Sequence, residues 1–228
     1  MINLVMDGKQ YQKNILLELM NLDEFKINIS NINKKNDSKE IKISKNINID
    51  NTSSIEELGG ILIENFGFTS RLIEGNINSK ILFFFGKCGK YDQKILDGKS
   101  GDLFDKMLSS ITLDREKISL ASYIPKGLEH LIDEENFLSK IQLINYRLIE
   151  LINPKYLIIM SNFCIKMLLA TDLSSMSLRG KWFDFNTPND TSPKKCRVLY
   201  EPEILLNNNE LKKDAWEDLK EIRKLLGG

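Results

Sequence analysis

The sequence predicts an α/β fold in which a parallel sheet of four strands lies between two layers of helices. Four short apolar runs are typical of buried strands. Residues 81–85 (Ile-Leu-Phe-Phe-Phe) are the clearest, because five large apolar residues in succession are too few for a helix. The other runs are residues 117–123, 156–160 and 197–200. Segments of helical periodicity separate the four runs, and this alternation is typical of parallel strands covered by helices on both faces.

Helices are predicted where apolar residues recur with the period of a helix. Ser54 begins one of them as a cap that is followed by Glu56 and Glu57, and this helix runs to about residue 65. The long segment 135–152 ends at Asn153-Pro154, because a proline disfavours helical geometry in the residue before it. The remaining helices are predicted over residues 10–22, 103–111, 163–169 and 212–226.

The chain of 228 residues is expected to divide into three parts. Residues 1–26 contain an amphipathic helix. Residues 27–53 are rich in Asn, Lys, Ile and Ser, a composition that seldom buries enough apolar surface to offset chain entropy. A flexible linker is therefore expected there, with a loose strand at residues 41–44 as the alternative. Residues 54–228 form the α/β domain.

Composition narrows the classes of function. The 32 basic and 32 acidic residues cancel, so any nucleic-acid or membrane contact must come from a local patch. Three cysteines that are far apart argue against a disulfide framework and favour a reducing, cytoplasmic location. Neither the cysteines nor the single histidine, His130, have the spacing of metal ligands, so no metal is expected. No secretion signal is expected, and no apolar run approaches the ~20 residues of a membrane span.

A binding site is expected at the turn that follows residues 81–85, because ligands of open α/β sheets bind at the carboxyl ends of the strands. The turn reads Gly86-Lys87-Cys88-Gly89-Lys90, and its glycines allow a sharp turn or a close approach to the main chain. The turn carries no carboxylate. Its lysines can lower the pKa of Cys88, but no histidine lies nearby in the sequence, so a structural thiol is preferred.

Five short motifs resemble, in order, those of the uracil-DNA glycosylase superfamily, and most closely its bacterial iron–sulfur type, called family four. Residues 86–89 stand where the family has Gly-Glu-Ala-Pro-Gly, and residues 200–206 (Tyr-Glu-Pro-Glu-Ile-Leu-Leu) stand where it has a Phe-His-Pro motif. Residues 178–182 (Leu-Arg-Gly-Lys-Trp) match a Leu-Arg-Gly-x-Trp element. The other matches are residues 98–108 with 113–115, and residues 212–219. The resemblance implies a DNA-repair enzyme that hydrolyses the N-glycosidic bond of a uracil flipped out of DNA.

The resemblance also implies that the catalytic side chains have been lost. The acid of the family's first motif falls at Lys87 and the histidine of its His-Pro motif at Glu201, with Asp92 as a candidate substitute carboxylate. The base-pocket positions fall at Gly86, Cys88, Leu96 and Ser122, where Leu96 replaces a stacking phenylalanine and Ser122 an asparagine that reads uracil. The cysteines that hold the family's iron–sulfur cluster are missing, so this cofactor is expected to be absent.

The expected function is therefore that of a uracil-DNA glycosylase-like protein whose activity is impaired or lost, and whether the chain is an enzyme stays open. No uracil-sized hollow lined by a carboxylate together with an aromatic side chain is expected beside Gly86. The alternative is a non-catalytic module that binds DNA, or that binds a protein through the helix at residues 10–22. Lys87 and Glu201 are expected either to form an ion pair or to remain two solvated side chains. The candidates for DNA contact are Lys90, Lys99, Arg179 and Lys181.

Overall fold

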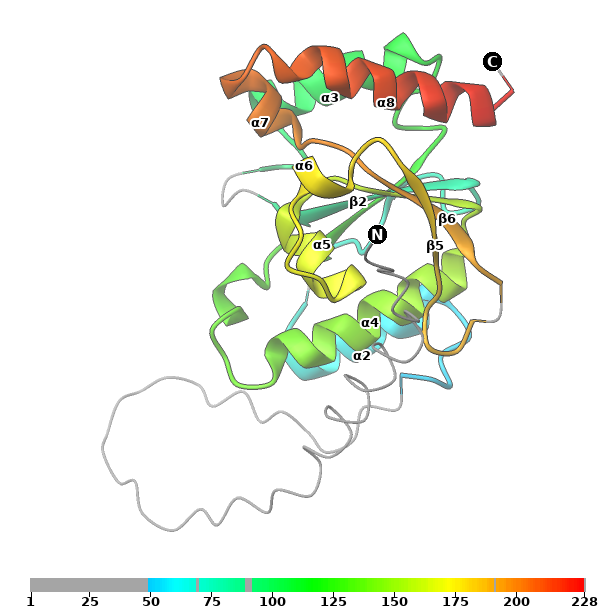
Figure 1. Cartoon of the computed structure of the whole chain (residues 1–228). Coiled ribbons are helices and arrows are strands. Elements are labelled where there is room, and N and C mark those ends of the chain that lie inside the picture. Colours follow the sequence, from blue (N-terminus) through cyan, green and yellow to red (C-terminus); the bar gives the residue numbers. More distant parts are fainter. Residues whose placement is uncertain (1–48, 69, 89–91, 191, 228) are drawn as a thin grey trace.

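Six strands form one sheet in this computed structural model, which describes residues 49–68, 70–88, 92–190 and 192–227. The order across the sheet is β1-β3-β2-β4-β6-β5 (Figure 1). The predicted helix at residues 10–22 and the linker as far as residue 48 lie outside the described residues. The strands are β1 (Glu74–Gly75), β2 (Ile81–Lys87), β3 (Ser119–Ile124), β4 (Tyr156–Ile159), β5 (Trp182–Phe185) and β6 (Lys194–Val198).

The sheet is mixed, whereas the sequence predicted four strands that all run parallel. β2 pairs in parallel with β3 and β4, and β4 pairs in parallel with β6. The short edge strands β1 and β5 are antiparallel to their neighbours β3 and β6. Both were missed because β1 has only two residues, while β5 carries exposed Asp184 at the edge of the sheet and therefore lacks a continuous apolar pattern.

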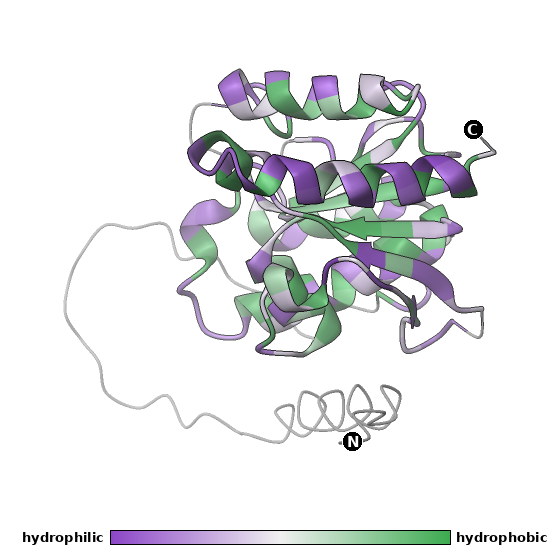
Figure 2. Ribbon diagram, turned by 45° about the horizontal axis from the view of Figure 1, so that its top comes forward, coloured by the Kyte–Doolittle hydropathy of each residue, from purple (hydrophilic) through white to green (hydrophobic). Residues whose placement is uncertain are grey.

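Helices cover both faces of the sheet. In Figure 1, α3 and α8 lie over one face, and α2 and α4 lie over the other. The interior strands are mostly hydrophobic in Figure 2, while the helices turn hydrophilic residues outward. No helix in the described ranges has both the length and the apolar character needed to cross a membrane. The helices are α2 (Ile55–Phe66), α3 (Gly98–Ser110), α4 (Phe137–Ile152), α5 (Asn162–Leu169), α6 (Ser175–Leu178), α7 (Pro202–Asn207) and α8 (Leu211–Leu225), with a 3-10 turn at Glu129–Leu131.

Strand β2 anchors both halves of the core. Alternate side chains of a strand point to opposite faces, so Phe84 joins the apolar cluster beneath α2 and α4, and Phe83 and Phe85 join the cluster beneath α3 and α8. Both rings of the second group pack edge-on against Phe104 of α3, with centroid distances of 5.4 and 5.2 Å. Each such buried side chain stabilises the fold by about 1.5–3 kcal/mol. The prediction that this strand is buried on both faces is confirmed.

A buried cluster of charges fixes α8 to the sheet. Asp218 of α8 is fully buried and accepts hydrogen bonds from Arg197 Nη2 of β6 at 2.5 Å and from Arg179 Nε at 3.0 Å. The backbone N–H of Gly180 also donates to Asp218, at 3.1 Å. The guanidinium of Arg197 lies 5.3 Å above the ring of Trp182, which adds a cation–π contact. This network holds the loop between α6 and β5 against α8.

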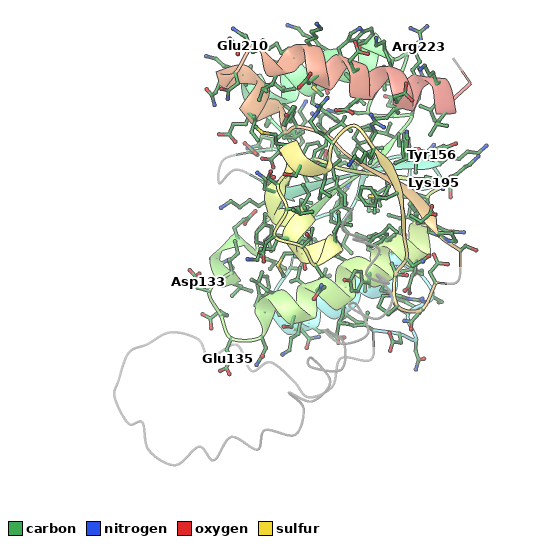
Figure 3. All side chains as sticks on the ribbon, in the orientation of Figure 1. Asp133, Glu135, Tyr156, Lys195, Glu210 and Arg223 are labelled. Carbon is green, nitrogen blue, oxygen red and sulfur yellow. The ribbon has the colours of Figure 1, made fainter. Side chains whose placement is uncertain are left out.

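The strands end on the side of the sheet that carries α5 and α7. Tyr156 and Lys195, which are paired in register near the starts of β4 and β6, lie together at the opposite end in Figure 3. The parallel strands β2, β4 and β6 therefore bring their carboxyl ends to one edge, which is where the sequence predicted a site.

Candidate functional site

A pocket of about 490 Å³ opens at the carboxyl ends of β2, β4 and β6. Each of these three strands, or the turn that follows it, contributes residues to the walls, and the loop before α4 contributes one more. We call this hollow the Glu201 pocket. It is lined by Gly86, Lys87, Cys88, Ile132, Ser161, Asn162, Phe163, Glu201 and Glu203.

Gly86 lets the turn after β4 come close to β2. A Cβ atom at this position would lie 2.6 Å from Ser161 Oγ and 3.3 Å from Ser161 Cβ, which is too close for any other residue without a shift. Ser161 is also the N-cap of α5, where its Oγ accepts a hydrogen bond from the N–H of Phe163 at 3.2 Å. The glycine in the predicted turn therefore permits a close approach between two segments of the chain.

Glu201 places a half-buried carboxyl group in the pocket. It precedes Pro202, which occupies the first turn of α7 and sets the direction of the chain out of β6. Burial raises the pKa of Glu201, the nearby hydroxyl of Ser161 partly offsets this rise by hydrogen bonding, and the charge of Glu203 adds to it. This carboxyl group therefore keeps its proton to a higher pH than a glutamate in water does.

Lys87 and Glu203 are exposed, although both line the pocket. The ion pair between Lys87 and Glu201 that the sequence allowed is wrong: within the described residues no such contact forms, and Lys87 is not among the charges that act on the pKa of Glu201. Lys87 is instead exposed to solvent as the last residue of β2. The carboxyl of Glu201 is left to face the pocket.

An aromatic ring also lines the pocket. Phe163, at the start of α5, is half-buried and packs edge-on against the fully buried Tyr123, with centroids 5.4 Å apart and planes at 87°. The expectation that no hollow beside Gly86 is lined by a carboxylate together with an aromatic side chain is therefore wrong, since Glu201 and Phe163 both line it. The resemblance had already placed Glu201, after β6, opposite the turn that follows β2, whereas Phe163, after β4, was not predicted.

Cys88 lies in the pocket wall but is not activated. Burial raises its pKa to about 11; a weak contact with the Ser122 hydroxyl at 4.0 Å opposes the rise, and the carboxylates of Glu129, Asp92 and Glu74 add to it. The alternative in which neighbouring lysines lower its pKa is wrong. The thiol is protonated at neutral pH, as the structural interpretation expected.

Three other predicted site residues lie outside the pocket lining. Ser122 is buried and donates a hydrogen bond to the carbonyl of Ile124 at 2.9 Å. Leu96 has a positive φ of 54°, and its carbonyl accepts a hydrogen bond from Arg115 at 2.8 Å. Asp92 is half-buried, and its charge contributes to the raised pKa of Cys88. The structure thus brings Gly86, Lys87, Cys88 and Glu201 together and leaves these three aside.

The predicted candidates for DNA contact differ in their exposure to solvent. Lys99 and Lys181 are exposed, while Lys90 lies outside the described residues. The prediction that Arg179 contacts DNA is wrong. Its side chain is only 18% exposed and is bound to Asp218 at 3.0 Å and to Asp214 at 3.2 Å. Two carboxylates hold its charge inside the fold, so it is not available to a phosphate.

A second, larger groove of about 700 Å³ adjoins the first and shares Asn162 with it. One wall comes from α6 and includes Met176, which is 68% exposed. The other wall comes from α7 and from the asparagines 207–209 that follow it. Asn162 stands at the junction, where its Oδ1 accepts a hydrogen bond from the N–H of Ser175 at 2.7 Å.

Sequence reasoning missed Ser161, Asn162 and Phe163, which make up one wall of the pocket. The signal that could have found them is their place directly after the apolar run at residues 156–160, because polar residues that follow a parallel strand gather at the binding edge of the sheet. In the part of the chain that the structure describes, no three His, Cys, Asp or Glu side chains are grouped so as to hold a metal ion.

A scan against known protein families and a search of curated proteins each return no match for this chain. What the site can do must therefore be argued from its own side chains. It offers a partly desolvated carboxyl group, a hydroxyl, an amide and an aromatic ring around a hollow of about 490 Å³. These groups suit a small planar ligand with hydrogen-bonding edges.

Proposed function

We propose that this chain is a uracil-DNA glycosylase-like protein that holds an extruded nucleobase in the Glu201 pocket and cleaves uracil from DNA slowly or not at all. The observation that carries the proposal is the position and lining of the pocket, which lies between the turn at residues 86–88 and the turn at residues 201–203. These are the two turns that resemble the first and the His-Pro motifs of the family. Between them stand the ring and polar groups that a flipped base requires.

The proposal extends to the fold. The parallel strands β3, β2, β4 and β6, with helices on both faces, would correspond to the three-layer α/β/α sandwich of the superfamily, and β1 and β5 would be additions at its edges. Residues of the family-like motifs also bind one another. Arg115 pairs with Asp105 at 2.6 Å within the second motif, and the Arg179–Asp218 pair joins the third motif to the last. Such contacts support kinship because residues of the family-like motifs hold one another in place within the fold.

Impaired cleavage follows from the charges of the site. Hydrolysis of an N-glycosidic bond needs a carboxylate that positions water or stabilises the sugar cation, and a donor that stabilises the departing base. The position of the family's acid is Lys87, an exposed cation. Glu201 is the one half-buried carboxyl group among the residues that line the pocket. It can take one of the two roles, while Glu203, the other carboxyl group among the lining residues, is exposed to solvent.

Two measurements test this function. In the first, uracil-containing single- and double-stranded oligonucleotides are incubated with wild-type protein and with Glu201→Ala, and alkaline cleavage is scored on gels. We expect wild-type cleavage to equal that of the variant and of a blank without protein. Rapid cleavage that is lost in Glu201→Ala would contradict the impairment and assign catalysis to Glu201.

The second measurement compares binding of a duplex with one mismatched base and the same duplex with an abasic site there, by fluorescence anisotropy. We expect the base to improve affinity about tenfold, as a stacked base does. Glu203→Trp should abolish the difference by filling the pocket mouth, whereas Glu217→Trp, at an exposed position on α8, should keep it. Equal affinity for the two duplexes in the wild type would exclude an extruded-base pocket.

The second candidate function is a non-catalytic binding module, and the groove beside the pocket favours it. Met176 and Leu173 are 68% and 50% exposed, and Met176 lines the groove of about 700 Å³ next to asparagine side chains. Apolar residues exposed beside a groove mark an interaction surface in many proteins. In the anisotropy experiment, binding of DNA that ignores the mismatched base but weakens in Met176→Ser would favour this second function.

A further inference from the structure

The polar groups of the Glu201 pocket differ in what they offer a ligand. Glu201 and Glu203 present carboxyl oxygens, and Lys87 is the one cation among the lining residues. Lys87 and Glu203 are both exposed, so water screens them, while the half-buried Glu201 is the charged group with the least access to solvent. A ligand edge that reaches into the pocket therefore meets a hydrogen-bond acceptor.

Asn162 supplies the complementary group. Its Oδ1 already accepts a hydrogen bond from the N–H of Ser175 at 2.7 Å, which leaves the amide N–H₂ as the part of this side chain that can bind a ligand. The Ser161 hydroxyl is engaged twice, by the N–H of Phe163 and by the carboxyl of Glu201. The pocket thus pairs one acceptor, Glu201, with one donor, Asn162, beside the ring of Phe163.

We propose that the base held in the Glu201 pocket is one that carries an exocyclic amino group, such as cytosine, and not uracil. This inference rests on the proposed base-binding function. An amino group donates to a carboxylate, and the ring nitrogen beside it accepts from an amide, so a cytosine edge matches Glu201 and Asn162. Uracil instead presents a carbonyl oxygen where cytosine has its amino group, and that oxygen would face the Glu201 carboxylate without a hydrogen bond.

The size of the expected preference for cytosine over uracil follows from the opposite hydrogen-bonding groups of the two bases. A buried polar group that loses its partner because the ligand offers the wrong atom is costly, so sites built around such a group discriminate strongly. Glu201 is only half-buried, and water can reach part of it. We therefore expect cytosine to be preferred by about tenfold, near the lower end of what one hydrogen bond to a charged group gives.

Isothermal titration calorimetry with cytidine and uridine tests the inference directly, because donor and acceptor are exchanged between the two bases both at the exocyclic group and at the ring nitrogen beside it. The expected result is that cytidine binds wild-type protein about tenfold more tightly than uridine at neutral pH. Glu201→Gln replaces the acceptor by an amide that can satisfy either base, and should reduce the ratio to near one. Glu201→Asp keeps the charge and should keep cytidine ahead, while Glu217→Gln on α8 should match the wild type.

Three other outcomes of this titration would each contradict a different part of the proposal. Uridine binding as tightly as cytidine would overturn the amino-base preference and leave the base pocket standing. A preference for cytidine that persists in Glu201→Gln would overturn the role given to Glu201. If neither nucleoside binds wild-type protein at millimolar concentration, both this inference and the proposed base-binding function fail.

Discussion

At the scale of single residues, Glu201 is the charged group of the pocket whose environment departs most clearly from that of a solvated side chain. A carboxyl group whose pKa is raised on folding is held more firmly in its protonated form by the folded chain than by the unfolded chain. Ionisation of Glu201 therefore opposes folding. An ionisable residue whose charged form destabilises the fold is more easily explained by a role in binding than by a role in stability.

The sign of this effect can be tested with Glu201→Gln. The stability that the protonated carboxyl provides is fully present below the pKa of the unfolded chain, near 4.5, and falls as the pH rises through the higher pKa of the folded state. We expect the variant to have a higher melting temperature than the wild type at pH 7, and the difference to shrink towards zero near pH 4. A variant less stable at pH 7 than at pH 4, relative to the wild type, would contradict the raised pKa.

Cys88 gives a second prediction at this scale. Because its pKa is raised to about 11, the thiolate is scarce at neutral pH, and alkylation by iodoacetamide should be slow at pH 7 and accelerate strongly towards pH 10. Cysteine content after unfolding in guanidinium serves as the reference for complete labelling. Complete modification of the native protein within minutes at pH 7 would show that Cys88 is more open and more acidic than its surroundings imply.

At the scale of elements, α8 is held by charge as well as by apolar packing. Asp218 looks, in the sequence, like part of the solvated face of an amphipathic helix, yet it is fully buried between Arg179 and Arg197. Two arginines and the N–H of Gly180 share one carboxylate, so the loop before β5, the strand β6 and the helix are connected at one point. The position of this loop depends on that connection.

Asp218→Asn is therefore expected to destabilise the protein by about 3–5 kcal/mol, because it leaves a buried arginine without its counter-charge. Asp214→Asn is the matched control, since Asp214 pairs with the same Arg179 but its side chain is 47% exposed, and it should lose less than about 1 kcal/mol. Urea unfolding followed by circular dichroism measures both. Equal losses of stability in the two variants would show that the buried Asp218 network stabilises the fold no more than the exposed Asp214 pair does.

The elements that the sequence predicted are those with a strong local pattern. The apolar runs gave β2, β3, β4 and β6, and helical periodicity gave α2, α3, α4, α5 and α8. Short pieces were missed, because β1, α6 and α7 contain two, four and six residues and carry little periodic signal. The pocket was predicted at Gly86 but only in part. Ser161, Asn162 and Phe163 join it through strand order, which local sequence does not encode.

Whether a charged side chain is buried or exposed was the hardest feature to predict, because it also depends on how distant segments meet. Lys87 and Glu201 belong to turns that do meet at the pocket, but one side chain turns to solvent and the other inward. Arginine is a residue type that usually lies at the surface, but Arg179 is bound to Asp214 and Asp218 inside the fold. Burial of a charge depends on partners far away in the chain, and a single sequence does not indicate which partners meet.

At the scale of the whole molecule, the sheet determines where binding can occur. Parallel strands bring three turns to one edge, and α5 and α7 leave a hollow there that contains the Glu201 carboxyl and the Phe163 ring. The larger groove continues from it past Asn162. Together they form a continuous surface on which an extruded base could occupy the inner part and its neighbours the outer part.

The most direct test of base binding at this edge is a titration of isotope-labelled protein with cytidine, followed by two-dimensional nitrogen–proton NMR. We expect concentration-dependent shifts of the backbone amides of Gly86, Ser161 and Asn162, with little change along α2, which contributes no residue to the pocket lining. Shifts confined to residues away from the Glu201 pocket, or no shifts at millimolar cytidine, would contradict it.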